Sequence, residues 1–596
     1  MSSLLNKLSS SLSNTESEAI SKTNNLEKIE SYNGESSDSD IQLNTNGAPV
    51  EKENPLGNNI EYISLAYLII NGVIGTGIFA TPSSILKSIG SVGASYVLWV
   101  VGFIIASFKL LVYSEYSTYF KNRSGGDVTY LEQAYPNPPF LVPTTYAAVS
   151  VILSFLNSSA VAFGQYILTA ADVEVTTWKS RGLAAGVLAF VCIIAALSTK
   201  WSIRISDFLG HVKIITLLFI GITGLVVLGG HTSIEDPKAN FRNSWEGTTT
   251  EPNNIANAII KVSFSYGGAF YAFATVSELP EHKRFKGYTR VVPAAFFFIF
   301  VTYILNVTAY FAGAGSIKEI KSSGSLIAST FFTNVFKTKA ATKALNVLVA
   351  IAAFSHLIVA VVAHSRALRE CGRQGVLPFR DFWVSTKPFG TPIGPIFVIF
   401  IVNLVVMIAP PAGDAYNFIV DVGAYSGYIF DFQLAVGLLL LRRQRKKAGL
   451  GYQGFRVPLP VLVLQILFQL FVLIMPLVPP KNKNGSLKGS DVSFFYATYC
   501  LVVYGLLAAC FAYYVVWQFI LPKIGGYEHR VETFQLENGE LGNRVVSVKV
   551  EDLEEWDRTH VAGNKLSTLE PAGTKVEVKD LDEDVIAVDH PINVKY

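Results

Sequence analysis

The chain has 596 residues, of which 50% are hydrophobic and only 16% are charged, and its mean hydropathy is +0.38. Soluble domains carry roughly 25% charged residues, and a soluble core does not absorb repeated apolar runs of about 18 residues or more. The composition also excludes collagen-like chains, and the four scattered cysteines exclude a disulfide scaffold. The chain is therefore predicted to cross a membrane many times.

Charge is divided unevenly between a central body and two tails. Residues 1–58 contain 4 basic and 9 acidic residues, and residues 521–596 contain 9 and 16, which leaves 35 basic and 20 acidic residues in 59–520. Polar, acidic tails are typical of solvated and mostly disordered segments. We expect 1–58 to be a disordered cytosolic tail, 59–520 the transmembrane domain, and 521–596 an acidic cytosolic tail. The tails are candidate docking sites for a ubiquitin-ligase adaptor, and an inert solvated tail is the alternative.

Apolar runs that can cross about 30 Å of hydrocarbon predict twelve helices. They span 61–86, 92–119, 142–171, 182–198, 208–229, 254–279, 290–313, 342–370, 393–410, 415–441, 457–478 and 493–520. These form three groups, with helices 1–5 over about 61–229, helices 6–10 over about 254–441 and helices 11–12 over about 457–520. The densest basic clusters follow helices six, eight and ten. Because Lys and Arg concentrate on the cytosolic side, both termini are predicted to be cytosolic, and the Asn484 glycosylation sequon then lies outside.

Glycines interrupt two of the predicted helices. Helix one reads Asn71-Gly72-Val73-Ile74-Gly75-Thr76-Gly77, and helix six reads Phe264-Ser265-Tyr266-Gly267-Gly268. Glycine costs roughly 1 kcal/mol relative to alanine in a helix interior. Unwound backbone inside a bilayer is tolerated where it lines a cavity or is buried in protein. Interruptions in corresponding helices of two five-helix halves indicate a transporter binding site.

The backbone groups freed by such interruptions suit a zwitterion. N–H groups at the start of a half-helix near Gly75 and Gly77 favour a carboxylate, and the carbonyl oxygens of Ile74, Phe264 and Gly267 can accept hydrogen bonds from an α-ammonium. Close helix packing through small residues is the alternative explanation of the glycines. Their occurrence in both helices favours a binding site.

These motifs resemble a known family. Gly75-Thr76-Gly77-Ile78-Phe79 resembles the GxGIF signature of amino acid–polyamine–organocation transporters. Glu115 followed by Gly125-Gly126 resembles the end of their second helix, and Phe264–Gly268 resembles the broken sixth helix of their L-type branch. Further stretches resemble the fungal methionine permeases of that family, at 168–172, 241–248, 375–379 and 410–416. The resemblance covers about 60–525.

The resemblance implies an all-α polytopic membrane protein with the leucine-transporter fold, which has two inverted five-helix repeats and two peripheral helices. It also implies that Thr76 and Gly77 bind the substrate carboxylate, and that Phe264 is an aromatic lid. The complete candidate substrate site is Ile74, Gly75, Thr76, Gly77, Phe264, Tyr266, Gly267, Gly268 and Phe270. Relatives often carry a polar asparagine after the double glycine, where this chain has Ala269-Phe270. The more aromatic wall suits an apolar or thioether side chain.

Ionisable residues within predicted helices are functional candidates, because a charge inside a bilayer is costly. Lys213 of helix five either snorkels to the interface or, as the resemblance implies, is a coupling residue whose ammonium takes the place of a coupling cation. Glu115 and Glu278 are predicted to form an inner gate with basic residues that follow helices six and eight, or to rest at the interface. One of Asp421 and Asp431 in helix ten is expected to face the pore.

The sequence therefore predicts a secondary transporter that imports a neutral L-amino acid, with methionine favoured, across the plasma membrane by proton symport and alternating access. The alternatives are a permease for another neutral amino acid and a non-transporting amino-acid sensor. ATP-driven transport is not expected, because GxxxxGK[ST] is absent from the sequence. A membrane-embedded enzyme is not expected, because the eight histidines are scattered, with no HxxxD or HExxH. The expected partners are the amino acid and membrane lipid. No nucleic acid, metal or cofactor is expected, and the proton is the predicted coupling ion.

Overall fold

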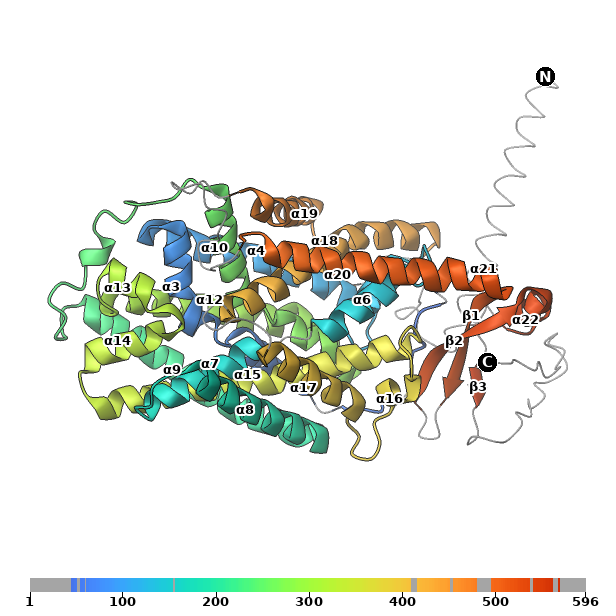
Figure 1. Ribbon diagram of the computed structural model, residues 1–596, viewed down its shortest axis with the longest axis horizontal. Helices are drawn as coiled ribbons and strands as arrows, with labels where there is room; N and C mark the ends of the chain where they lie inside the picture. The colour runs from blue at the N-terminus through green and yellow to red at the C-terminus, as the bar shows by residue number, and fades with distance from the viewer. Residues whose placement is uncertain are drawn as a thin grey trace, which may run out of the picture.

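The computed structural model describes residues 44, 46–50, 54–58, 60–153, 156–408, 415–450, 454–479, 495–535, 540–560 and 566–568 (Figure 1). Most of the predicted N-terminal tail, the Asn484 sequon and the end of the C-terminal tail lie outside these residues.

The first half of the chain is helical, with short loops. Its α-helices are α2 (Tyr62–Val73), α3 (Gly77–Ile89), α4 (Val92–Tyr119), α5 (Asp127–Ala134), α6 (Leu141–Ile152), α7 (Asn157–Ala170), α8 (Thr177–Leu197), α9 (Thr199–Leu228) and α10 (Pro252–Ser265), with the short turn η2 (Ala239–Phe241) before α10.

The second half continues in the same way until the last helix, after which strands appear. The elements are η3 (Ala269–Glu278), α11 (Glu281–Lys286), η4 (Gly287–Val291), α12 (Val292–Gly313), α13 (Ile317–Ser322), η5 (Gly324–Leu326), α14 (Ile327–Phe336), α15 (Lys339–Arg373), α16 (Arg380–Val384), α17 (Ile393–Ile408), α18 (Ala415–Lys447), α19 (Leu459–Ile474), η6 (Met475–Leu477), α20 (Thr498–Val515), η7 (Val516–Ile520), α21 (Leu521–Gly525), β1 (Tyr527–Gln535), β2 (Leu541–Lys549), η8 (Val550–Asp552), α22 (Leu553–Thr559) and β3 (Leu566–Thr568).

Among the described residues, eleven helices or helix pairs are long and apolar enough to cross a membrane. The predicted ninth helix is present as α17, whose 16 described residues rise about 24 Å at 1.5 Å per residue. The residues that follow, 409–414, lie outside the described part of the chain. The predicted all-helical membrane architecture is confirmed for the body of the chain, with eleven helices or helix pairs of full spanning length in its described part.

Helix five differs most from its predicted bounds. It begins at Thr199, nine residues before the predicted start, because Ser198 caps it and accepts a hydrogen bond from the Trp201 amide. The polar residues Arg204 and Asp207 in its first turns shift the apolar run of the sequence away from the true start. Lys213 therefore lies at the middle of the helix and not near its end.

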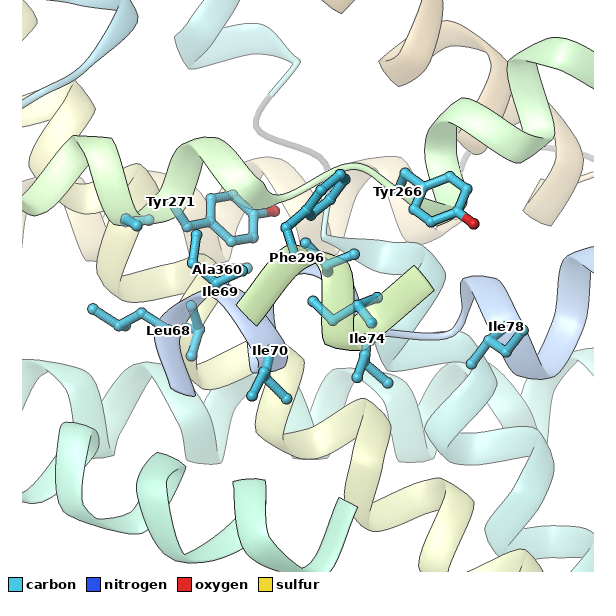
Figure 2. Packing of buried hydrophobic residues seen from close by; sticks show 14 of the residues in the cluster. Leu68, Ile69, Ile70, Ile74, Ile78, Tyr266, Tyr271, Phe296 and Ala360 are labelled. Carbon is cyan, nitrogen blue, oxygen red and sulfur yellow. The ribbon is translucent and has the colours of Figure 1, made fainter. Parts of the chain in front are cut away.

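Many of the long helices, among them α8, α15, α18 and α20, run along the long axis of the molecule, whereas α3 and α10 run across it (Figure 1). The loops with α13 and α14 form one end, and the strands form the other, which we call the sheet end. A continuous core of aliphatic and aromatic side chains runs between the helices. Figure 2 shows the part of it that surrounds α2 and α3, with Ile70, Ile74 and Ile78 along the chain and Tyr266, Tyr271 and Phe296 opposite.

Folded strands occupy part of the tail that the sequence predicts to be solvated. β1 pairs antiparallel with β2, from Tyr527 opposite Lys549 to Gln535 opposite Leu541, and parallel with β3. Val531, Phe534 and Val546 are buried. This hairpin was missed because the tail as a whole is acidic, and the short alternation of apolar and polar residues in the strands was not considered. Asn538-Gly539, between the two strands, is a hairpin signal in the sequence.

Candidate functional site

The predicted interruption of helix one is present. α2 ends at Val73, residues 74–76 are not helical, and α3 begins at Gly77. The amide of Gly75 turns back onto the Val73 carbonyl oxygen at 2.9 Å. The first amides of α3, those of Gly77 and Ile78, have no acceptor within the helix because the first turn of any helix leaves its N–H groups unpaired. These amides are available to an anion.

The predicted interruption of helix six is present as well. α10 ends at Ser265, and η3 begins at Ala269. Gly267 donates to the Phe264 carbonyl oxygen at 3.0 Å in a tight turn, and Gly268 has φ +90°. This left-handed conformation favours glycine, because a Cβ atom is strained there.

The two interruptions are in direct contact. A Cβ atom on Gly72 would lie 2.8 Å from the Gly268 carbonyl oxygen, and one on Gly77 would lie 2.7 Å from Ser265 Cα. Gly72 therefore allows the two backbones to pack closely, which is the alternative role that the sequence analysis gave to the glycines. The packing joins the two breaks to each other.

Tyr303 of α12 links the same two breaks, and sequence reasoning missed it. Its hydroxyl lies 3.0 Å from the Val73 carbonyl oxygen and 3.0 Å from the Ser265 carbonyl oxygen. These carbonyls are the last of α2 and of α10, so neither has a partner in the regular hydrogen-bond pattern of its own helix. The Val73 carbonyl oxygen accepts from the Gly75 amide and from Tyr303. The available signal was a tyrosine inside a long apolar helix, since a buried hydroxyl requires a partner.

Lys213 reaches the first interruption from α9. Its side chain is buried, and Nζ donates to the Ile74 carbonyl oxygen at 2.7 Å and to the Asn71 carbonyl oxygen at 3.4 Å. In the described part of the chain, no carboxylate forms an ion pair with it. The ammonium therefore does not extend to the membrane interface. It donates to the Ile74 carbonyl oxygen, which is one of the acceptors that the sequence analysis assigned to a substrate amine.

The ring of His356 of α15 packs directly against the backbone of the first interruption at Gly75. A Cβ atom on Gly75 would lie 2.9 Å from His356 Cδ2, so only glycine fits without displacing the ring. His356 Nδ1 lies 2.9 Å from the Ser159 hydroxyl of α7. The backbone of α2 and α3 is thus enclosed by α9, α12 and α15.

The predicted aromatic residues of helix six point in different directions. Tyr266 packs within an aromatic cluster with Trp99, Phe296 and Tyr303, at ring-centroid distances of 5.2–5.9 Å, and its hydroxyl has no hydrogen-bond partner. Phe264 is half-buried. Phe270 faces a cavity of about 170 Å³ on the sheet side of the break. Tyr266 therefore supports the fold, and Phe270 is exposed to a space that a ligand can enter.

Lysine–aspartate pairs lie along α18, and both predicted aspartates take part. Lys109 of α4 contacts both carboxylate oxygens of Asp431, at 2.7 and 2.9 Å, beside this cavity. Lys261 of α10 pairs with Asp421 at 3.1 Å, with both side chains buried. The sequence expectation that one of the two aspartates faces the pore fits Asp431, which lines the cavity.

The chain is similar to known transporters over most of its length. A family model described as amino acid permease matches residues 60–519. The chain belongs to the amino acid permease family. This permease is 36% identical to the high-affinity methionine permease of Saccharomyces cerevisiae over 482 residues, which cover 78% of this chain and 80% of the relative. It is 26% identical to the low-affinity methionine permease of the same organism over 488 residues, or 80% and 85% of the two chains.

A more distant relative extends the comparison to animals. The permease is 25% identical to human large neutral amino acids transporter small subunit 2 over 457 residues, which cover 76% of this chain and 81% of the relative. The family resemblance inferred from the sequence motifs is confirmed. The permease is a multi-pass membrane transporter of amino acids and not an enzyme.

The two predicted gate glutamates of the permease have different partners. Glu278 at the end of η3 accepts a hydrogen bond from Arg366 of α15 at 2.9 Å, as expected, and Arg366 also donates to the Thr199 hydroxyl at 3.0 Å. Glu115 instead pairs with Arg442 of α18 at 2.5 Å and accepts from the Val457 amide at 2.7 Å. Glu278 thus ties the broken helix six to helices five and eight, whereas Glu115 fastens α4 to α18 and to the start of α19.

Both terminal regions of the permease close over the sheet end of α15. Arg373 donates to the Leu541 carbonyl oxygen of β2 at 2.7 Å and to the Pro49 carbonyl oxygen at 2.5 Å. Asn543 of β2 donates to the Gly47 carbonyl oxygen at 2.7 Å. The last part of the tail predicted as disordered, around Gly47 and Pro49, is therefore ordered by contacts with polar groups of α15 and β2.

Proposed function

We propose that this permease is a secondary transporter that imports a neutral L-amino acid, with methionine the favoured substrate, across the plasma membrane. The contact between the two helix interruptions carries the proposal, because it brings backbone donors and acceptors that lie outside regular helix hydrogen bonding into one place inside an apolar bundle. Methionine is favoured because two relatives, at 36% and 26% identity, are named methionine permeases. Aromatic residues around η3 suit a thioether.

In this proposal the backbone recognises the zwitterion. The amides of Thr76 and Gly77 bind the α-carboxylate at the positive end of α3. The carbonyl oxygens of Phe264 and Gly267 bind the α-ammonium, and that of Ile74 is shared with Lys213. Phe264 closes over the substrate, and the side chain extends toward Gly268 and Phe270. Because Gly75 has no side chain, the backbone can approach the His356 ring closely enough for the site to form.

Import proceeds by alternating access with proton symport. The twelve helices form two inverted repeats of five plus two peripheral helices, with α17 as the ninth, and both termini lie in the cytosol. Lys213 couples the break to the ion gradient, since its ammonium holds the position of a coupling cation. Opening toward the cytosol requires the Glu278–Arg366 pair to separate, whereas Glu115 holds α4 against α18 as the gate moves. The tails beyond the sheet remain available to a ubiquitin-ligase adaptor.

The test is uptake of radiolabelled L-methionine by the purified full chain in liposomes, with about pH 5.5 outside and about pH 7.5 inside, compared with equal pH. We expect saturable accumulation that is faster with the gradient. No methionine uptake, with uptake of another neutral amino acid, would assign a different substrate. Methionine binding without any flux would favour a sensor.

A further inference from the structure

The cavity on the sheet side of the break carries an unbalanced charge. Its lining includes the ammonium of Lys109 and the carboxylates of Asp127 and Asp431. Lys109 holds both oxygens of Asp431, so that pair is neutral. Asp127 is left as a second carboxylate in a space whose other walls are mostly apolar, and an unpaired carboxylate in such surroundings is costly.

Asp127 makes few contacts for a carboxylate. Oδ2 accepts one long hydrogen bond of 3.3 Å from the Tyr146 hydroxyl, and Oδ1 is shielded from solvent without a hydrogen-bond partner. The hydroxyl of the buried Tyr113 faces the same carboxylate and, as a donor, lowers its pKa. A shielded carboxylate with tyrosine hydroxyls beside it and no ion-pair partner of its own among the described residues indicates that a cation or a proton completes this site in part of the transport cycle.

The groups that face this carboxylate come from four neighbouring helices and set its affinity for a proton. They are Lys109 and Tyr113 of α4, Tyr146 of α6, His364 of α15 and Asp431 of α18. Burial raises the pKa of Asp127 to about 6, which Lys109 opposes and Asp431 reinforces. A group with this pKa is mostly protonated in an acidic medium and keeps roughly a tenth of its proton at pH 7.

The position of Asp127 connects it to the second break. Gly125, two residues earlier, donates its amide to the Ala274 carbonyl oxygen of η3 at 3.0 Å. The cavity that Asp127 lines also includes Phe270 of η3 and His364, whose ring centroids are 6.1 Å apart. A movement of η3 on substrate release therefore displaces the loop that carries Asp127 and changes its exposure to water.

We propose that Asp127, next to the Lys109–Asp431 pair, is the residue that binds and releases the co-transported proton. This inference rests on the proposed proton symport. The proton adds to the carboxylate from the acidic side and gives a neutral carboxylic acid, which the apolar cavity tolerates. It leaves to water at the sheet end when η3 moves, and restores the carboxylate.

The experiment uses the full-length permease in liposomes that contain a pH-sensitive dye. L-methionine is added outside at equal pH, and acidification of the lumen is measured. Counterflow, which is exchange of labelled for unlabelled methionine, is measured in parallel because exchange needs no net proton movement. For Asp127→Asn we expect at least tenfold less acidification per methionine, with counterflow within twofold of the parent chain. Asp381→Asn, a change in an exposed carboxylate of the same end, should keep both, and Asp127→Glu should restore acidification.

The outcomes separate the two proposals. Methionine uptake by the parent chain without acidification would refute proton symport itself. Acidification that Asp127→Asn leaves unchanged would keep proton symport and overturn the role of Asp127. Loss of counterflow together with acidification, in Asp127→Asn and in Asp127→Glu alike, would overturn it too, because Asp127 would then be needed for structure or movement.

Discussion

Replacing Lys213 with methionine removes the buried ammonium at the first break and keeps an unbranched side chain that is one heavy atom shorter. Nζ donates to the Ile74 carbonyl oxygen at 2.7 Å. A hydrogen bond from a charged donor contributes about 1.5–3 kcal/mol, which corresponds to roughly 10- to 150-fold in affinity. The freed carbonyls must then find another donor, and the break loses the conformation in which its amides face the substrate.

We therefore expect Lys213→Met to weaken methionine binding by roughly 10- to 150-fold, measured as the Kd of radiolabelled L-methionine for the purified permease. Lys179→Met, at an exposed lysine in the first turn of α8, is the control and should bind as the parent chain does. A Kd for Lys213→Met within about twofold of the parent value would refute the reasoning, because the ammonium would then contribute nothing to the site.

Three further substitutions test the break and the gate. Tyr303→Phe removes the hydroxyl shared by the two helix ends and should lower the affinity for methionine by roughly 5- to 10-fold, as the loss of a neutral hydrogen bond of about 1 kcal/mol or slightly more implies, measured as a Kd. Gly268→Ala should abolish uptake, because its φ of +90° is strained for alanine and the new methyl group would collide with the Gly72 carbonyl oxygen; uptake and thermal stability are measured together. Glu278→Gln weakens the pair with Arg366 and should favour the state open at the sheet end, seen as faster labelling of a cysteine introduced into the cavity.

Each of these variants has a matched control at a position where the same chemical change meets no partner in the core. The controls are Tyr513→Phe, Gly182→Ala and Glu281→Gln, at exposed or open positions. An unchanged Kd in Tyr303→Phe would show that the hydroxyl does not hold the breaks. Normal uptake by Gly268→Ala would mean that the contact between the two breaks is dispensable, and equal labelling of Glu278→Gln and the parent chain would exclude a gate at this pair.

Much of the fold could be predicted from local sequence features. Apolar runs located the helices, because each span must bury about 20 residues in hydrocarbon. Glycines located both breaks, because they combine low helix propensity with the freedom to adopt a positive φ, as Gly268 does. The predicted start of helix five was wrong because its first three turns carry Arg204 and Asp207. These residues reduce the apolar signal, although the helix is capped before them.

The contacts around the site depend on residues far apart in the chain and could not be predicted in the same way. Glu115 and Arg442 are 327 positions apart, and nothing local distinguishes Arg442 from the basic residues around it. The same limit applies to the pairing of Lys109 with Asp431. Asp127 gave no signal because its significance comes from a missing partner, which only the packed structure reveals.

The central claim is that backbone groups of the two breaks recognise the charged ends of an amino acid. Displacement of bound radiolabelled L-methionine from the purified permease tests it most directly. L-norleucine, which keeps both charges, should compete. The methyl ester of methionine lacks the carboxylate, and 4-(methylthio)butanoate lacks the ammonium. Each should therefore need a roughly 10- to 150-fold higher concentration than L-norleucine for half displacement, since each lost charged contact costs about 1.5–3 kcal/mol. Competition by either analogue as strong as that of L-norleucine would contradict the account.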